Sequence, residues 1–188
     1  MNGETNSMSL LKVQVYYIFN KQEKKLKKEI NELLNKKIMN IFQVSADIIK
    51  FGMNDYGKPY ISQPQGMEYN ISHTQGMGVM ALSQYPVGVD IELIKDIPKG
   101  VLKRCYHLEE QQYVLKREDY REKKIRFYEI WTKKEAYVKW LGTGIDKEFS
   151  TFSVLDELIC HNFQTVYMNG YIMTLYTDQN YYSVWERG

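Results

Sequence analysis

The first forty residues combine an alternating apolar pattern with a helical one. In "LLKVQVYYIF", Val13, Val15, Tyr17 and Phe19 stand at alternate positions, which predicts a β-strand with these side chains on one face. Residues 20–42 predict an amphipathic helix whose other face is rich in lysine. Its apolar positions at helical spacing are Leu26, Ile30, Leu33, Leu34, Ile38, Ile41 and Phe42.

Short apolar runs separated by turn-forming residues follow as far as residue 93. The runs "DIIKF", "MEYNIS", "GVMALS" and "VGVDIEL" predict four strands. Residues 52–66 carry glycine and proline throughout, so they predict loop and turn. The "SQYP" stretch between the last two runs predicts a hairpin turn.

The pattern turns helical between Pro98 and Leu141 and then returns to strands. The clearest helix covers residues 125–142, and Gly142 and Gly144 are expected to end it. Residues 149–188 predict a run of short strands with turns at 169–170 and 178–180. This layout indicates an α+β fold with helices on one side of antiparallel strands.

Composition and charge narrow the class of protein. The 188-residue chain is 44% hydrophobic and 26% charged, as in ordinary globular proteins, and its net charge of +2 does not indicate nucleic-acid binding. The two cysteines form no CxxC pair, which argues against a zinc site. No signal peptide and no membrane-spanning run is recognisable. We therefore expect a cytoplasmic protein without a membrane partner, with residues 1–8 as a loose tail.

Two carboxylates interrupt the apolar run "VGVDIE". Side chains alternate across a strand, so Asp90 and Glu92 point to the same face, about 7 Å apart along the chain. Like charges this close repel each other unless a cation or basic groups lie between them, and carboxylate oxygens suit a hard cation such as Mg²⁺. The alternative is a solvated edge strand whose outer face is acidic.

A second charged group lies on the helix "WTKKEAYVKW". Trp131, Glu135 and Lys139 follow one another at intervals of four residues, so they share one stripe of the helix. Taken alone, this pattern is more typical of a surface Glu–Lys pair beside a tryptophan that anchors the helix to the core.

Two shorter motifs precede these. In "YNISHTQG", a strand ends in Ser72, His73 and Thr74, whose side chains can donate hydrogen bonds to phosphate oxygens, although a single histidine is more commonly a packed or surface residue. In "GKP", Lys58 stands between a glycine and a proline, so we expect a stiff turn to hold its backbone.

In their order and spacing the four motifs resemble those of the 4′-phosphopantetheinyl transferases, in particular the surfactin-synthetase type. That family has a G-K-P turn, an (F/Y)-N-x-S-H segment, a G-(I/V)-D-(I/V)-E strand and a W-(S/T)-x-K-E-(A/S)-x-x-K helix. Here they stand as "GKP" from Gly57, "YNISH" from Tyr69, "VGVDIE" from Val87 and "WTKKEAYVK" from Trp131. The resemblance covers residues 51–144, half of the chain.

The resemblance implies a fold and an activity. The fold is a pseudo-twofold pair of similar α+β subdomains with antiparallel sheets and the active-site cleft between them, here residues 1–86 and 87–188. The activity is Mg²⁺-dependent transfer of 4′-phosphopantetheine from coenzyme A to a serine of an apo acyl or peptidyl carrier protein, with release of adenosine 3′,5′-bisphosphate. A monomer would suffice, and carriers of secondary metabolism, for polyketides or nonribosomal peptides, are favoured.

The resemblance also gives the charged residues their roles. Asp90, Glu92 and Glu135 match the magnesium carboxylates, which come from a strand and a helix together. Glu135 is also the candidate base for the serine proton, directly or through water. Lys139 would stabilise the transferring phosphate as a compact point charge.

The resemblance assigns the binding of coenzyme A to the two shorter motifs. Ser72 and His73 match residues that contact the coenzyme A phosphates, together with Lys139, and His73 is therefore a catalytic candidate as well. Gly57, Lys58 and Pro59 match the turn that lies against the adenosine part. Trp131 is expected to pack the helix rather than to touch substrate.

The chain departs from the family pattern before these motifs. Larger members grip the 3′-phosphate of coenzyme A with arginine, but no arginine precedes Arg104 here. Lysines of the first helix, Lys28 among them, are candidates to replace it, although lysine lacks the bidentate grip of arginine. The alternative is a solvated helix face. The lysines concerned are Lys24, Lys25, Lys27 and Lys28.

Residues 93–114 match the region that docks the carrier protein in the family. Basic side chains there would steer an acidic carrier, and apolar side chains would contact it. The basic candidates are Lys95, Lys99, Lys103 and Arg104, and the apolar ones are Ile97, Val101, Leu102 and Tyr106.

Two other interpretations remain open at this point. One is a non-catalytic relative that binds coenzyme A or a nucleotide and acts as a regulatory or scaffold protein. The other is a different magnesium-dependent phosphotransferase or phosphodiesterase, but no GxxxxGK(S/T) loop is present. The complete set of Asp90, Glu92, Glu135 and Lys139 favours the transferase.

Overall fold

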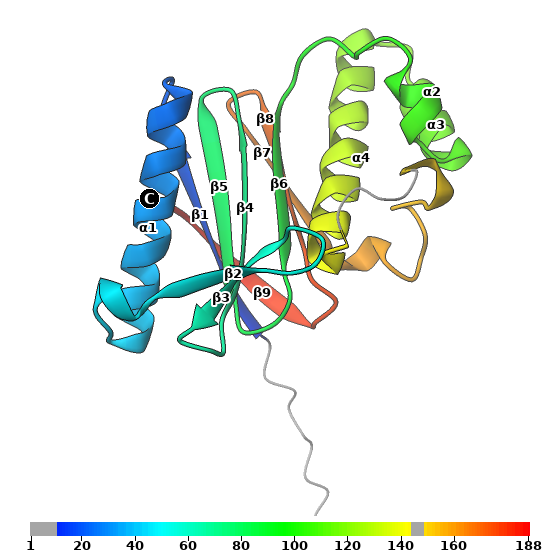
Figure 1. Cartoon of the computed structure of the whole chain (residues 1–188). Coiled ribbons are helices and arrows are strands. Elements are labelled where there is room, and N and C mark those ends of the chain that lie inside the picture. The colour runs from blue at the N-terminus through cyan, green and yellow to red at the C-terminus, as the bar shows by residue number, and fades with distance from the viewer. Residues whose placement is uncertain (1–10, 144–148) are drawn as a thin grey trace, which may run out of the picture.

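The computed structural model describes residues 11–143 and 149–188. Figure 1 shows two β-sheets at the centre of the molecule, with helix α1 (Glu23–Phe42) beside one sheet and helix α4 (Tyr120–Leu141) beside the other. Two shorter helices, α2 (Val101–Cys105) and α3 (Leu108–Leu115), lie on the outer side of α4. The mixed α+β fold with antiparallel sheets is confirmed, while the pseudo-twofold relation stays a prediction.

The first sheet has four strands in the order β4-β5-β1-β9. Neighbours are antiparallel except β1 and β9, which are parallel. The predicted first strand and helix are confirmed, because α1 buries Leu26, Ile30, Leu34 and Ile38 against this sheet. The strands are β1 (Leu11–Phe19), β4 (Glu68–Thr74), β5 (Met77–Ser83) and β9 (Tyr181–Arg187).

The second sheet has three antiparallel strands in the order β6-β8-β7. These are β6 (Gly88–Leu93), β7 (Phe163–Met168) and β8 (Tyr171–Tyr176). The turn between β7 and β8 is the predicted one, and Asn169 and Gly170 both have positive φ angles, 51° and 83°. Gly142 ends α4 in the left-handed conformation, as expected, whereas Gly144 and residues 1–8 lie outside the described residues.

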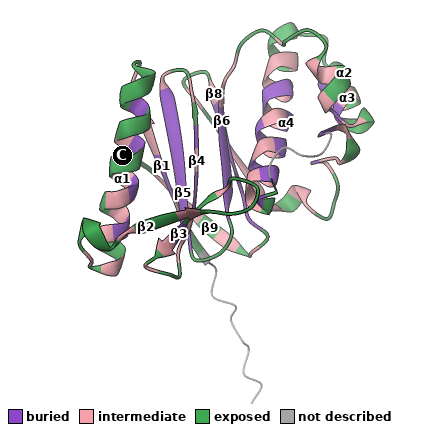
Figure 2. Ribbon diagram, in the orientation of Figure 1, coloured by how far each residue is buried: buried purple, intermediate pink, exposed green. Residues whose placement is uncertain are grey.

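The two sheets pack against each other through one apolar core. Val13, Val15 and Val79 from the first sheet meet Val89 and Ile91 from the second, and all five side chains are buried. Figure 2 shows this buried layer running through the middle of the molecule. The division at residues 86 and 87 stays a prediction, and β9 at the end of the chain completes the sheet built by the first part.

Helix α4 lies unusually close to β6. A methyl group added at Gly88 would come within 1.9 Å of the Ala136 carbonyl oxygen, so only glycine permits this contact. The close approach brings the face of α4 that carries Glu135 and Lys139 next to the strand that carries Asp90.

Three local predictions are wrong. Residues 52–66 are not all loop, because β2 (Lys50–Met53) and β3 (Pro59–Gln63) form a two-stranded hairpin. The "SQYP" stretch does not close a hairpin, because β1 and β4 occupy both edges of β5 and β6 joins the other sheet. Residues 149–162 carry two 3-10 turns, Phe149–Thr151 and Cys160–Asn162, where strands were expected.

A third 3-10 turn, Ala46–Ile48, takes up part of the predicted strand "DIIKF". Among the described residues no helix is both long and apolar enough to cross a membrane. The expected cytoplasmic location stays a prediction.

Candidate functional site

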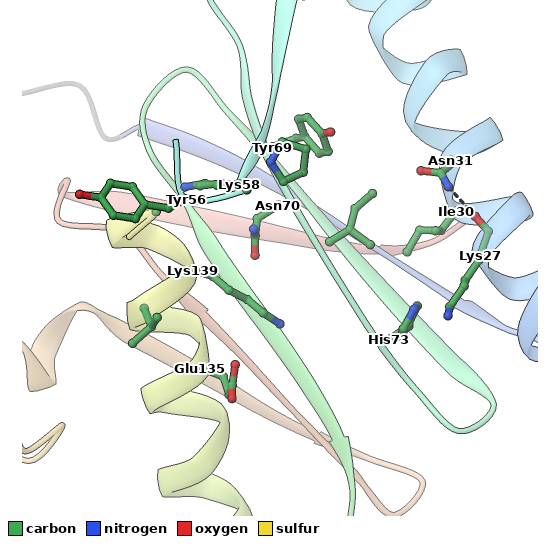
Figure 3. Close-up of a pocket in the computed structure, with 15 residues that line it drawn as sticks. Lys27, Ile30, Asn31, Tyr56, Lys58, Tyr69, Asn70, His73, Glu135 and Lys139 are labelled. Atoms are coloured by element: carbon green, nitrogen blue, oxygen red, sulfur yellow. Dashed lines mark hydrogen bonds between the residues drawn. The ribbon is translucent and has the colours of Figure 1, made fainter. Parts of the chain in front are cut away.

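A cavity of about 550 Å³ opens between α1, β4, the turn before β3 and the end of α4. This volume lies in the range of small-molecule sites. Seven residues that the sequence singled out contribute to its lining, and Figure 3 shows His73 from β4 and Glu135 and Lys139 from α4 around it. The seven are Lys27, Gly57, Lys58, Pro59, His73, Glu135 and Lys139.

Asp90, Ser72 and Lys139 form a closed triangle of hydrogen bonds beside this cavity. The Lys139 ammonium lies 2.6 Å from Asp90 Oδ1 and 2.9 Å from Ser72 Oγ, and the Ser72 hydroxyl donates to Asp90 Oδ1 at 2.7 Å. Asp90 is only 3% exposed. Its side chain therefore points inward to α4 and not to solvent, as a site residue requires.

Glu92 is held from two sides. The Thr74 hydroxyl donates to its Oε2 at 3.3 Å, and the Trp131 side chain forms a further hydrogen bond with the carboxylate. Burial and the nearby Asp90 raise the pKa of Glu92, while these two hydrogen bonds and Lys139 act in the opposite direction. Trp131 thus packs the helix, as expected, and also contacts a candidate metal ligand.

Glu135 has the most strongly shifted carboxyl group of the cavity. The pKa of Glu135 is raised from its usual 4.5 to about 7, chiefly by burial and then by Asp90 and Glu92, while Lys139 opposes the rise. The mutual electrostatic effects show that the three predicted metal carboxylates share one region. The structure thus brings together side chains from β6 and α4 that lie far apart in the sequence.

The donor set fits a hard divalent cation. Negative charge on Asp90 raises the pKa of both Glu92 and Glu135, which a cation would offset, and Asp90 Oδ2 is buried with no hydrogen-bond partner among the described residues. As the described side chains stand, no group of three His, Cys, Asp or Glu is arranged to hold a metal ion. The Lys139 ammonium instead supplies the positive charge at Asp90.

The "GKP" turn is fastened to the end of α4. The Asn54 side chain accepts from the Lys58 amide at 2.8 Å and donates to the Gly142 carbonyl at 2.8 Å. The Lys58 ammonium donates to the Trp140 carbonyl at 3.2 Å, and burial lowers the pKa of Lys58. Gly57 has a φ of 81°, which glycine adopts without strain.

Among the candidate lysines of α1, Lys27 faces the cavity and Lys28 does not. Lys28 is 75% exposed and pairs with Glu32 at 3.5 Å, whereas Lys27, one position earlier, lines the cavity with Asn31 (Figure 3). The helical rotation of about 100° per residue places neighbouring lysines on different faces. Together with Lys58 and Lys139, Lys27 makes the cavity suited to an anion.

Sequence reasoning passed over Asn70 on β4, and it named Thr74 on the same strand only as a residue able to donate to phosphate. Asn70 is buried, lines the cavity and accepts from the Val89 amide at 2.8 Å. The signal for these residues was present, because Asn70, Ser72 and Thr74 alternate along the strand and so share one face.

One apolar residue predicted to contact a carrier cannot do so. Tyr106 is 1% exposed, stacks on Phe127 and donates its hydroxyl to the Phe127 carbonyl, so it belongs to the core. Lys103 and Arg104 are exposed on α2, as a docking surface requires. Leu108, at the start of α3, is 69% exposed and lies next along this surface.

Comparison with known proteins shows to which family the chain is similar. Residues 86–180 match the family model of the 4′-phosphopantetheinyl transferase superfamily. The chain is 31% identical over 121 residues to the 4′-phosphopantetheinyl transferase gsp of Aneurinibacillus migulanus, which covers 64% of this chain and 49% of that protein. It is 32% identical over 122 residues to Sfp of Bacillus subtilis (strain 168), which covers 65% and 54%.

A third similar protein is the 4′-phosphopantetheinyl transferase HetI of Nostoc sp. (strain PCC 7120 / SAG 25.82 / UTEX 2576), 30% identical over 105 residues, with 53% of this chain and 44% of that protein covered. The chain thus spans about half the length of the curated relatives it matches. The matched region includes β6 and α4, and with them the three candidate metal carboxylates.

Proposed function

The chain belongs to the 4′-phosphopantetheinyl transferase superfamily, and on that premise we propose that it transfers 4′-phosphopantetheine from coenzyme A to a serine of an apo carrier protein. Adenosine 3′,5′-bisphosphate is the other product. The observation that carries this proposal is the meeting of Asp90, Glu92, Glu135 and Lys139 beside a cavity whose other lysines suit a phosphorylated ligand.

The reaction needs few groups from the protein. The serine Oγ forms a bond to the phosphorus that carries pantetheine, and the bond from that phosphorus to the bridging oxygen of the adenosine bisphosphate breaks. The serine proton goes to Glu135, directly or through water, because Glu135 is the carboxylate that lines the cavity. The leaving group departs with the electron pair of the broken bond.

The remaining charged residues bind and orient. Lys139 reaches the cavity from α4 and places a point charge at the transferring phosphate, for which it gives up its contact with Asp90. His73 and Lys27 lie across the cavity, in reach of further phosphates, while the turn with Lys58 faces the adenosine part. Ser72 supports Asp90 from β4.

Asp90, Glu92 and Glu135 would hold Mg²⁺, whose role when bound is to offset negative charge on the pyrophosphate and the leaving group. Binding requires Lys139 to move away from Asp90, and the buried Oδ2 of Asp90 then gains a partner.

We propose that the carrier protein approaches over α2 and the start of α3. Lys103 and Arg104 are exposed there beside Leu108, so an acidic carrier surface would meet positive charge and an apolar side chain together. Reversing both charges should raise the apparent Michaelis constant for the carrier and leave that for coenzyme A unchanged. An unchanged constant for the carrier would rule out this approach.

Intact-mass spectrometry of the carrier tests the transfer itself. Protein, Mg²⁺, coenzyme A and an apo carrier are mixed, and the carrier is expected to gain the mass of phosphopantetheine. Asp90→Ala and Glu135→Ala should abolish the gain. Glu129→Ala is the matched control, because Glu129 lies on the same helix but pairs with Lys133, and it should retain activity. No gain with acyl, polyketide and peptidyl carriers would refute the proposal.

A further inference from the structure

Strands β4 and β6 run side by side although they belong to different sheets. Each is the edge strand of its own sheet, and Figure 1 shows the two next to each other at the centre of the molecule. Side chains of β4, rather than a ladder of backbone pairs, make the hydrogen bonds that join them. How these side chains are spaced therefore decides how the two sheets are aligned.

Three polar residues of β4 alternate along the strand and reach β6 in the same order. Because the partners advance in the same direction along both strands, β4 and β6 run parallel here. Two of the three, Asn70 and Ser72, are 6% and 8% exposed, so burying either side chain without a hydrogen-bond partner would destabilise the fold. The contacts are Asn70 Oδ1 to the Val89 amide at 2.8 Å, Ser72 Oγ to Asp90 Oδ1 at 2.7 Å, and Thr74 Oγ1 to Glu92 Oε2 at 3.3 Å.

We propose that this polar face of β4 sets the positions of the two β6 carboxylates, and that Thr74 is a positioning residue for Glu92. The inference rests on the proposed function, in which Glu92 binds the metal. Glu92 has three rotatable side-chain bonds, and repulsion from Asp90 drives its carboxylate away from the site. Thr74 on one side and Trp131 on the other oppose that movement.

Thr74→Val removes the hydroxyl and keeps the branched shape, so it isolates the hydrogen bond. Residues that orient a metal ligand typically change metal affinity by about 10- to 100-fold when they are lost. We expect the dissociation constant for Mg²⁺ to rise about tenfold, with kcat at saturating Mg²⁺ close to that of the unmodified chain. Thr74→Ser keeps the hydroxyl and should restore the affinity.

The position of Glu92 can be read without metal or activity. The chain has three tryptophans, Trp131, Trp140 and Trp185, so a ¹⁵N–¹H spectrum shows three indole signals. Trp131 is hydrogen-bonded to Glu92, and we expect its indole signal to shift in Thr74→Val. An unshifted Trp131 signal would overturn the inference even if the protein is an active transferase.

Calorimetric titration of Mg²⁺ in the presence of coenzyme A tests the consequence. Thr177→Val is the matched control, because the buried Thr177 hydroxyl donates to the Pro86 carbonyl at 2.9 Å, just before β6 and away from the three contacts. It should lower the melting temperature and leave Mg²⁺ affinity unchanged. Equal losses of affinity in both variants would mean general loosening and would overturn the role of Thr74.

The two measurements keep the inference and the proposed function apart. If the unmodified chain binds no Mg²⁺, the metal part of the proposed function fails and Thr74 has no metal to serve. A shifted Trp131 signal with unchanged Mg²⁺ affinity in Thr74→Val would leave the transferase standing and refute the positioning role. A shifted signal with weakened Mg²⁺ binding, both restored in Thr74→Ser, supports it.

Discussion

Lys134, next to Glu135 on α4, is completely buried, and so is its partner Glu110 on α3. The Lys134 ammonium lies 2.9 Å from Glu110 Oε2 and donates to the carbonyls of Phe149 and Phe152, each at 2.6 Å. Burial lowers the pKa of Lys134, and the hydrogen bond to Glu110 partly offsets this. Glu110 also accepts from the amides of Val154 and His107, each at 2.8 Å.

Lys134→Met leaves the Glu110 carboxylate buried without a cation and two carbonyls without their donor. Removing one partner of a buried ion pair costs about 3–5 kcal/mol, because the remaining charge stays desolvated. For a domain of this size each kcal/mol lowers the melting temperature by about 2–4 °C, so a fall of about 6–20 °C is expected. Few other single substitutions on α4 should lower the free energy of unfolding by as much.

Urea unfolding followed by circular dichroism measures the change in free energy. Lys133→Met is the matched control, because Lys133 pairs with Glu129 at 2.7 Å but both side chains remain partly exposed, and pairs of that kind contribute about 1 kcal/mol or less. Combining Lys134→Met with Glu110→Gln removes the unpaired charge and should recover part of the loss. If Lys134→Met were no worse than Lys133→Met, the reasoning about the buried pair would be refuted.

Three further outcomes are expected. Without metal, the pKa of Glu135 is about 7 in the folded chain and 4.5 in the unfolded chain, so between these pH values the folded chain keeps a proton that the unfolded chain has lost. The free energy of unfolding should therefore fall by at most about 3 kcal/mol as the pH rises through this range. Glu135→Gln should remove this pH dependence, as measured by thermal melts at several pH values. Gly88→Ala should cost about 3 kcal/mol or more in urea unfolding, because the new methyl group meets the Ala136 carbonyl, and wild-type stability would contradict the close packing of α4 on β6. Lys139→Met should slow phosphopantetheine transfer about 100- to 1,000-fold in the mass-spectrometric assay, and a rate near that of the unmodified chain would exclude Lys139 from the reaction.

Local sequence patterns were sufficient to predict a helix, strand or turn whose conformation depends only on its own residues. The apolar positions of α1 predicted a helix because one face is buried and the other solvated, and Asn169–Gly170 predicted a turn because both residues tolerate positive φ. The same patterns failed for "SQYP", where the chain leaves one sheet for another. A short polar stretch has the same composition in a hairpin and in such a crossing.

The choice among neighbouring residues also needed the structure. The lysine-rich face of α1 indicated a basic helix, but only the angle at which α1 packs on β1 and β5 decided that Lys27 faces the cavity while Lys28 pairs with Glu32 in solvent. Likewise, Tyr106 resembles an exposed interface residue by its neighbours in sequence. Its burial follows from where α4 lies.

By itself, the sequence determined the family and the candidate residues for its chemistry, because the motifs around Asp90, Glu92, Glu135 and Lys139 are local and their order is characteristic of one family. Only the tertiary structure decided how those residues are held. The contacts of Ser72 with Asp90 and of Thr74 with Glu92 join the edges of two different sheets. Such contacts depend on the packing of the whole core between the sheets, which no short stretch of the sequence encodes.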